Sequence, residues 1–201
     1  MPDNVVTYYL SVNSPWTFLG GARLHAVAKK YGVSVDVRPV DATKLFPVSG
    51  GLPVPKRAPQ RQAYRFAELD RWRRFLDIDL ILEPQHFPAP ERVPAGMVVA
   101  AQSMGGDALA LATAFGHALW VDDEDFSQRD VQLRVAQSLG FDGAQLVDAA
   151  TSPETTEALE GCTQSAIDAQ VFGMPTYIFR GELFWGQDRL DFLERAIQSA
   201  V

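Results

Sequence analysis

The sequence has 201 residues, of which 47% are hydrophobic and 21% charged, and its formal net charge is −7. These values are typical of a globular protein, either one domain with a large core or a small domain that carries a large insertion. The acidic charge argues against a nucleic-acid-binding protein, no apolar run is long enough for a membrane span, and the segment MPDNVV lacks the features of a signal peptide, so we expect a cytoplasmic protein.

The first forty residues predict a strand, a helix and a second strand. Residues 5–10 (VVTYYL) are β-branched and aromatic, which favours a strand. Apolar residues then recur at three- and four-residue spacing from Trp16 to Lys30, and Gly32 ends this helix. Residues 33–40 (VSVDVRPV) alternate apolar and polar side chains, as a strand with one buried face does. This order predicts a βαβ unit with parallel strands.

The middle of the chain is predicted to be helical, with two proline-rich interruptions. Four prolines and Gly50-Gly51 predict a loop over residues 46–59, and a second loop is expected over 83–94. Between these loops a helix is expected over residues 59–77. Further helical patterns occur at residues 95–104, 107–121, 127–139, 142–150 and 154–170.

The C-terminal segment predicts a hairpin and a final helix. Residues 175–186 (PTYIFRGELFWG) contain two short strands around a turn at Arg180-Gly181, and a helix begins near Gln187. The layout is therefore βαβ, a long helical segment, and ββα. We predict an α/β fold in which residues 1–45 and 171–201 form one domain with a small mixed sheet, and residues 46–170 form an all-helical insertion.

A Ser-Pro pair, Ser14-Pro15, stands at the start of the first helix. The local interpretation is a capped helix, since serine is a favoured N-cap and proline a favoured first residue. The functional interpretation uses the same geometry, because the N-terminus of a helix stabilises an anion such as a thiolate. A ligand would have to supply that thiolate, and Ser14 would donate a hydrogen bond to it.

Two motifs near the C-terminus also have a structural and a functional interpretation. Pro175 precedes a strand, which indicates either a trans proline at a sheet edge or a cis Met174–Pro175 bond that turns the backbone of Met174 toward an extended peptide. In residues 185–190 (WGQDRL), Asp188 either complements the dipole of the last helix or accepts hydrogen bonds from a ligand ammonium group, with Gln187 beside it.

The cysteine and histidine content excludes several chemistries. The single cysteine, Cys162, permits neither an intrachain disulfide nor a CxxC pair, and its helical context favours a small apolar role. The three histidines are far apart, so we expect no metal site.

The three motifs, in this order and with a helical block between them, resemble the 2-hydroxychromene-2-carboxylate isomerases. These are relatives of the kappa-class glutathione transferases within the DsbA-like branch of the thioredoxin fold. SPWT resembles the C-P-x-C motif of DsbA-like oxidoreductases with serine in place of the first cysteine; FGMPT resembles F-G-V-P-T, and FWGQDRL resembles W-G-N-D-R-L. AYRFAELDRW, at residues 63–72, resembles the helix after the family's active-site loop.

The resemblance implies a thioredoxin-like fold and a glutathione-dependent isomerase. Ser14 would face the glutathione sulfur, Met174 before cis Pro175 would pair with the tripeptide backbone, and Gln187 and Asp188 would hold its γ-glutamyl end. The family reaction interconverts 2-hydroxychromene-2-carboxylate and trans-o-hydroxybenzylidenepyruvate, a step in the breakdown of aromatic compounds. The resemblance also implies a homodimer.

The sequence departs from the family on the side of the second substrate. Pro55 and Phe66 stand where relatives carry an asparagine and a lysine that help bind the substrate, so the substrate itself is open, and Lys56 or Arg57 are candidate replacements. Residues 56–74 hold seven basic side chains, which form either a solvated helix face or a positive field for carboxylate ligands. The expected stacking surface for an aromatic substrate includes Trp16, Tyr64 and Trp185.

Three alternatives compete with the isomerase. A kappa-class-like glutathione transferase would use the same glutathione site. A thiol–disulfide oxidoreductase is disfavoured, because Ser14 and Thr17 replace both cysteines of its motif. A non-catalytic thioredoxin-like module would bind a peptide at the edge next to Pro175.

Overall fold

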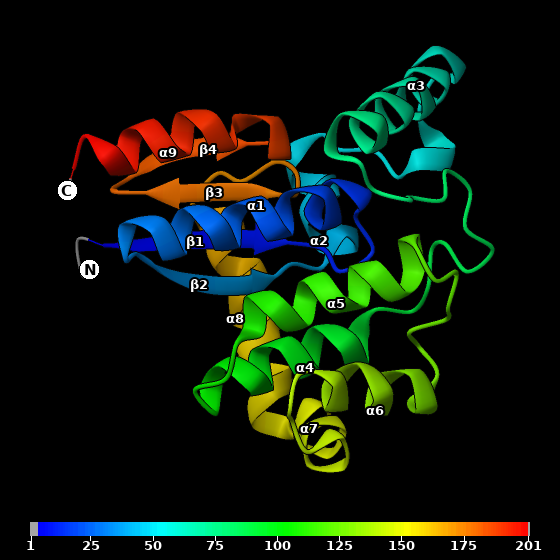
Figure 1. Ribbon diagram of the computed structural model, residues 1–201, viewed down its shortest axis with the longest axis vertical. Helices are drawn as coiled ribbons and strands as arrows, with labels where there is room; N and C mark the ends of the chain where they lie inside the picture. Colours follow the sequence, from blue (N-terminus) through cyan, green and yellow to red (C-terminus); the bar gives the residue numbers. More distant parts are fainter. Residues whose placement is uncertain (1–3, 201) are drawn as a thin grey trace.

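The computed structural model describes residues 4–200. Its centre is a four-stranded mixed sheet (Figure 1) in the order β2-β1-β3-β4. β1 pairs in parallel with β2, whereas β3 is antiparallel to both β1 and β4. The strands are β1 (Val5–Leu10), β2 (Ser34–Pro39), β3 (Thr176–Phe179) and β4 (Glu182–Trp185). The predicted mixed sheet, with a βαβ unit at one end of the chain and a hairpin at the other, is confirmed.

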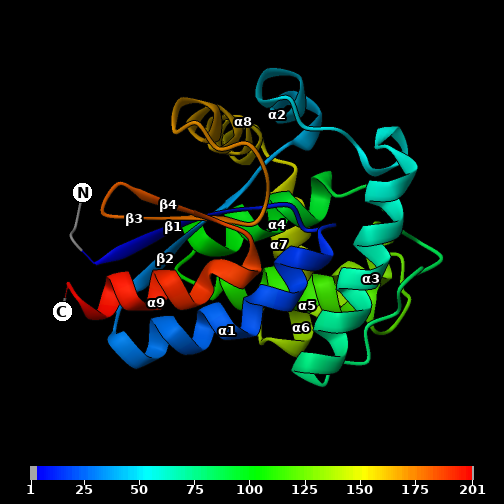
Figure 2. The same ribbon diagram turned by 90° about the horizontal axis from the view of Figure 1, so that it is seen from above.

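Helices cover both faces of the sheet (Figure 2). α1 (Pro15–Tyr31) and α9 (Leu190–Gln198) lie on one face, and α2 (Ala42–Ser49) and α8 (Pro153–Asp168) lie on the other. The remaining helices are α3 (Pro59–Leu76), α4 (Arg92–Ser103), α5 (Ala108–Trp120), α6 (Arg129–Ser138) and α7 (Gly143–Ala150), with the short 3-10 helices η1 (Val54–Lys56) and η2 (Gln187–Arg189).

The side chains of β1 alternate between two hydrophobic clusters. Tyr8 and Leu10 belong to the larger core, which extends from the sheet through α1 into α4 and α5 and includes Trp120. Tyr9 points to the opposite face, where it packs with Leu45 of α2 and with α8. Because successive strand residues face opposite sides, this alternation fixes the register of the central strand.

α3 stands apart from the helical block formed by α4 to α7 (Figure 1), and it contacts the body of the protein near α1. None of the helices described in residues 4–200 has the length and hydrophobicity that a membrane span requires. The two termini lie at one end of the sheet, while α2 and the start of α1 lie at the other (Figure 1).

The predicted loop over residues 46–59 is wrong in its first part. α2 extends to Ser49 and ends at Gly50, which has a left-handed conformation. Asp41 caps this helix, since its Oδ1 accepts a hydrogen bond from the N–H of Thr43 at 2.8 Å. Pro47 lies inside α2, where it removes only one backbone bond from a short helix. The many prolines of this segment suggested a loop, but the capping residues Asp41 and Gly50 mark the two ends of a helix.

Candidate active site

The three motifs meet at the end of the sheet opposite the termini. Tyr9, near the end of β1, pairs with Thr176 at the start of β3, and Thr176 pairs with Trp185 at the end of β4. The segments that follow β1, precede β3 and follow β4 therefore lie next to one another. These segments contain Ser14, Met174 and Asp188.

Ser14 is the N-cap of α1, as predicted. Its Oγ accepts a hydrogen bond from the N–H of Thr17 at 3.3 Å, and Pro15 is the first residue of the helix. The first turn of α1 contains no acidic side chain that would neutralise the positive end of the helix dipole from within the helix. The hydroxyl that accepts from Thr17 retains its own proton, which remains available for a ligand anion at this end of the helix.

Glu91 fixes the loop that leads to Ser14. Its Oε2 accepts hydrogen bonds from Ser11 Oγ and from the N–H of Asn13, both at 2.9 Å. The side chain of Asn13 pairs with the backbone of Ala89, with Nδ2 donating to the carbonyl at 2.7 Å and Oδ1 accepting from the N–H at 3.0 Å. Burial raises the pKa of the Glu91 carboxyl, although these hydrogen bonds oppose the shift. No sequence motif points to Glu91, which lies at the end of a proline-rich segment.

A Glu91→Gln variant is expected to gain stability relative to the wild type as the pH rises from about 4 to 7. Because burial raises the pKa of Glu91 above the ordinary value of a glutamate, the folded protein keeps a proton that the unfolded chain has already released. Rising pH therefore destabilises the wild type, by about 1.4 kcal/mol for each unit by which the pKa of Glu91 in the folded protein exceeds that in the unfolded chain. The amide of the Gln variant does not titrate, so its stability lacks this loss. Urea unfolding of both proteins across this range measures the difference, and parallel curves would contradict the prediction.

The Met174–Pro175 bond is cis, which is one of the two alternatives that the sequence left open. Thr176 Oγ1 donates to the carbonyl of Gly173 at 2.7 Å, and the N–H of Gly186 donates to the carbonyl of Pro175 at 2.9 Å. Among residues 4–200, no hydrogen bond engages the N–H or the carbonyl of Met174. The half-buried Met174 therefore has a free donor and a free acceptor beside the Ser14 end of α1.

Gln187 and Asp188 have different surroundings. Gln187 is buried, and its Oε1 accepts a hydrogen bond from Arg23 Nη1 at 2.8 Å. Asp188 is exposed and has one ionic partner, Arg189, at 3.1 Å. Gly186 precedes them with φ of 102°, and a Cβ at this position would lie 2.4 Å from Asp188 Oδ1. Gly186 thus turns the chain so that Gln187 faces the protein and Asp188 faces solvent.

The other predicted site residues divide into two groups. Trp185 is half exposed and its ring lies 4.8 Å from that of Phe172, at the same end of the sheet as Ser14. Trp16, in the first turn of α1, packs against the main core. The remaining three residues come from the η1–α3 segment: Lys56 is exposed, Arg57 is half buried with its Nε bonded to the carbonyl of Leu52, and Tyr64 is exposed beside Arg71.

Cys162 lies on α8, on the other face of the sheet from α1 (Figure 2). Burial raises the pKa of its thiol to about 11. A thiol in this state is a poor nucleophile at neutral pH. In the described part of the chain, no three side chains of the metal-ligating types form a group that could hold a metal ion.

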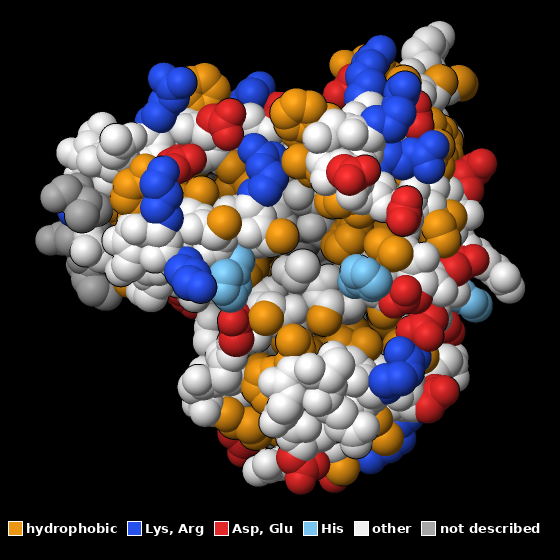
Figure 3. Space-filling view, in the orientation of Figure 1, with side chains coloured by type: hydrophobic (Ala, Val, Ile, Leu, Met, Phe, Trp, Pro, Cys, Tyr) orange, Lys and Arg blue, Asp and Glu red, His pale blue; other side chains and the backbone are white. Residues whose placement is uncertain are grey.

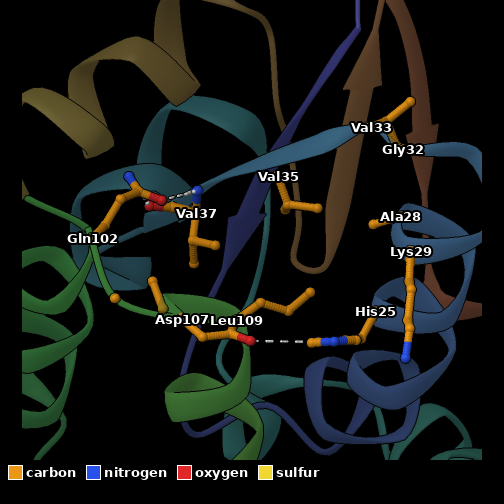
Figure 4. Close-up of a pocket in the computed structure, with 12 residues that line it drawn as sticks. His25, Ala28, Lys29, Gly32, Val33, Val35, Val37, Gln102, Asp107 and Leu109 are labelled. Atoms are coloured by element: carbon orange, nitrogen blue, oxygen red, sulfur yellow. Dashed lines mark hydrogen bonds and ion pairs between the residues drawn. The ribbon is translucent and has the colours of Figure 1, made fainter. Parts of the chain in front are cut away.

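Two hollows lie along α1. One, of about 390 Å³, lies between α1, β2 and the start of α5, where His25 faces Asp107 at 3.8 Å (Figure 4). The other, of about 520 Å³, lies between α1, α5 and α6 and is lined by His25 and His117 among others. The face of the molecule in Figure 3 carries histidine side chains, drawn in pale blue. None of the residues of the three motifs lines either hollow.

Comparisons with known proteins agree with the fold. The family described as DSBA-like thioredoxin domain matches residues 5–198. A 2-hydroxychromene-2-carboxylate isomerase from Pseudomonas sp. (strain C18) is 28% identical over 201 residues, covering 98% of this chain and 91% of the relative. A protein of the same name from Sphingobium xenophagum is 27% identical and covers 94% of this chain and 95% of the relative.

Solved structures give the same result. A structure of 2-hydroxychromene-2-carboxylate isomerase matches with a TM-score of 0.81 and 26% identity, covering 97% of this chain and 95% of the other. The cytosolic disulfide reductase DsbM from Pseudomonas aeruginosa shares the fold, with a TM-score of 0.70 and 17% identity over 96% of this chain and 99% of its own. The chain therefore belongs to the DSBA-like thioredoxin domain family and is similar over nearly its whole length to the 2-hydroxychromene-2-carboxylate isomerases.

Proposed function

We propose that the protein is a glutathione-dependent isomerase that interconverts 2-hydroxychromene-2-carboxylate and trans-o-hydroxybenzylidenepyruvate or a related aromatic carboxylate. The observation that carries the proposal is Ser14 at the N-terminus of α1, next to the free backbone groups of Met174, in a chain whose one cysteine lies elsewhere. This arrangement suits a thiolate that arrives with a ligand. The similarity to enzymes of this name supports the reaction class.

The residues at this end of the sheet fit glutathione by their chemistry. Met174 offers one N–H and one C=O to the tripeptide backbone, as an added strand requires. The exposed carboxylate of Asp188 suits the α-ammonium group of the γ-glutamyl end. Gln187, bonded to Arg23, holds the segment that carries Asp188. The role of Gln187 in this proposal is therefore to position its neighbour.

The mechanism divides the work between the ligand and the protein. Glutathione, held by Met174 and Asp188, would supply a thiolate nucleophile for reversible addition to the conjugated carbon of the substrate, which would allow rotation about the former double bond. Ser14 Oγ donates a hydrogen bond to the sulfur anion, and the N–H groups at the start of α1 stabilise the same charge. Both interactions lower the pKa of the bound thiol, so that more of it is ionised at neutral pH.

Asp188→Asn is expected to weaken glutathione binding about tenfold, because the variant loses a charge-assisted hydrogen bond to the ligand ammonium group. Isothermal titration with glutathione measures the change. Glu182→Gln on β4 is the control, since it removes the same charge from an exposed position and should leave the affinity within about twofold. No heat from the wild type at millimolar glutathione would refute the proposed function.

A kappa-class-like glutathione transferase is the second candidate. Pro55 and Phe66 favour it, because they replace the polar pair expected on the second-substrate side. Turnover of 2-hydroxychromene-2-carboxylate, compared with conjugation of 1-chloro-2,4-dinitrobenzene, distinguishes the two. A homodimer and a cytoplasmic location also stay predictions.

A further inference from the structure

Arg65 on α3 has surroundings that no other charged residue of the described chain shares. It is 7% exposed, and it is the only charged side chain among residues 4–200 classed as buried. Its Nη2 is fully buried and has no hydrogen-bond partner there. An arginine stays charged in proteins, so burial without a partner is costly unless something else pairs with the guanidinium.

Aromatic rings, and no acids, surround this guanidinium. Its central carbon lies 5.2 Å from the ring centre of Phe87 and 5.7 Å from those of Trp120 and Phe66. Rings within this range attract a cation but accept no strong hydrogen bond. Burial, and then the charge of Arg57, lower the pKa of Arg65 to about 10. The positive charges of Arg57 and Arg65 therefore repel each other, and no acidic side chain of the described residues neutralises them.

Besides Arg65, α3 carries four arginines, of which three have an acidic partner, whereas Arg61 has none in residues 4–200. Arg71 pairs with Glu68, Arg73 pairs with Asp70 at 2.9 Å, and Arg74 also pairs with Asp70 at 2.6 Å. No ion pair within 4 Å is found for Arg57 or Arg65 in residues 4–200. Much of the basic surface at the α3 end (Figure 3) is thus neutralised locally, whereas the buried part is not.

The unpaired guanidinium is connected to the Ser14 loop through one side chain. Trp120 Nε1 donates to the carbonyl of Asn13 at 3.2 Å, and Asn13 is the residue before Ser14. The ring of Trp120 contacts Phe87 at 4.9 Å, and Arg65 lies against both rings. Ala89, two residues after Phe87, pairs with the side chain of Asn13. Arg65 is therefore held next to the loop that positions the catalytic hydroxyl.

We propose that Arg65, assisted by Arg57, binds the carboxylate of the second substrate, with the half-buried ring of Phe87 against its flat conjugated part. This inference rests on the proposed function for the identity of the substrate. A guanidinium offers two parallel N–H donors that match a carboxylate, and a site screened from water strengthens the pairing. The ligand class is an aromatic or conjugated monocarboxylate. The glycine carboxylate of glutathione is the competing source of the same chemistry.

The first test uses cinnamate and its neutral analogue cinnamamide, without glutathione. In titrations, the wild type should bind cinnamate at least about tenfold more tightly than cinnamamide. Arg65→Met should bind the two ligands equally. Arg74→Met is the matched control, because it removes the same charge from the same helix and should keep the preference. Equal binding of cinnamate and cinnamamide by the wild type would overturn the inference.

The second test separates a substrate contact from a structural role. Arg65→Met should raise the KM for 2-hydroxychromene-2-carboxylate about tenfold or more, keep the Kd for glutathione within about twofold and leave urea stability equal or higher, because it removes an unpaired buried charge. A weaker Kd for glutathione with unchanged cinnamate binding would assign the guanidinium to the tripeptide instead. A loss of stability would assign it a structural role.

Two further outcomes keep this inference distinct from the proposed function. If Arg65→Met does not fold, Arg57→Met, at a less buried position, should reduce the cinnamate preference, and an unchanged preference would overturn the inference. If the wild type prefers cinnamate through Arg65 but never binds glutathione, the carboxylate site stands and the isomerase proposal fails.

Discussion

Ser14→Ala is expected to lower isomerase turnover about 10- to 100-fold while glutathione still binds. The lost group is a hydrogen-bond donor to an ionised sulfur, and a hydrogen bond to a charged group contributes about 1.5–3 kcal/mol. Without it, the pKa of the bound thiol should rise by about one to two units. Turnover measured against pH, together with the ultraviolet absorbance of the thiolate in the complex, reports both changes. Ser14→Thr, which retains a hydroxyl, should recover part of the rate.

The chain contains a matched control for the capping role of Ser14. Ser152 begins α8 in the same Ser-Pro-x-Thr pattern, and its Oγ accepts from the N–H of Thr155 at 3.2 Å, compared with 3.3 Å for Ser14 and Thr17. Ser14→Ala and Ser152→Ala should each cost about 1 kcal/mol of stability through the lost cap. Only the first should lower turnover. If both variants lose turnover in proportion to their stability, Ser14 is a helix cap and the catalytic role is refuted.

The sequence was sufficient to predict which motifs would come together. Ser14, Met174 and Asp188 each adjoin a strand, and strand pairing transmits their positions across the sheet: Tyr9 pairs with Thr176, and Thr176 with Trp185. Local signals such as the Ser-Pro cap and the Arg180-Gly181 turn depend on a few neighbouring residues, and the structure confirms both. This is why the sheet, and the grouping of Ser14, Met174 and Asp188 at one end of it, could be predicted from short stretches of sequence.

The contacts that the sequence did not reveal all join distant segments. Glu91 reaches Ser11 and Asn13 across some eighty positions, and nothing in its proline-rich surroundings indicates that pairing. Arg65 gave a partial signal, because it precedes Leu69 by four residues and so shares its buried helix face. The basic residues of 56–74 are consistent with either a solvated helix face or a positive field, and apart from this spacing nothing in the sequence distinguishes Arg65 from the other six. Its burial depends on Phe87 and Trp120, whose positions are fixed by tertiary packing.

Trp120→Ala is expected to destabilise the protein by about 3–5 kcal/mol, the usual cost of truncating a buried tryptophan. Trp120 is fully buried in the main core, where it supports Phe87 and Arg65 and donates to the carbonyl of Asn13. Its loss creates a cavity and leaves that carbonyl without its partner. Urea unfolding measures the cost. Turnover should also fall at temperatures where the variant is folded, because Asn13 leads directly into Ser14.

Two further variants help to interpret the loss of stability in Trp120→Ala: one separates packing from hydrogen bonding, and the other is a control on an exposed ring. Trp120→Phe keeps an aromatic ring and loses the indole N–H, so it should cost less than Trp120→Ala but still loosen the Ser14 loop. Phe75→Ala on α3 truncates an aromatic ring that is 76% exposed, and it should change stability by no more than about 0.5 kcal/mol. If Trp120→Ala were as mild as Phe75→Ala, the helical insertion would not support the active-site loop. A large cost combined with unchanged turnover would limit the role of Trp120 to the core.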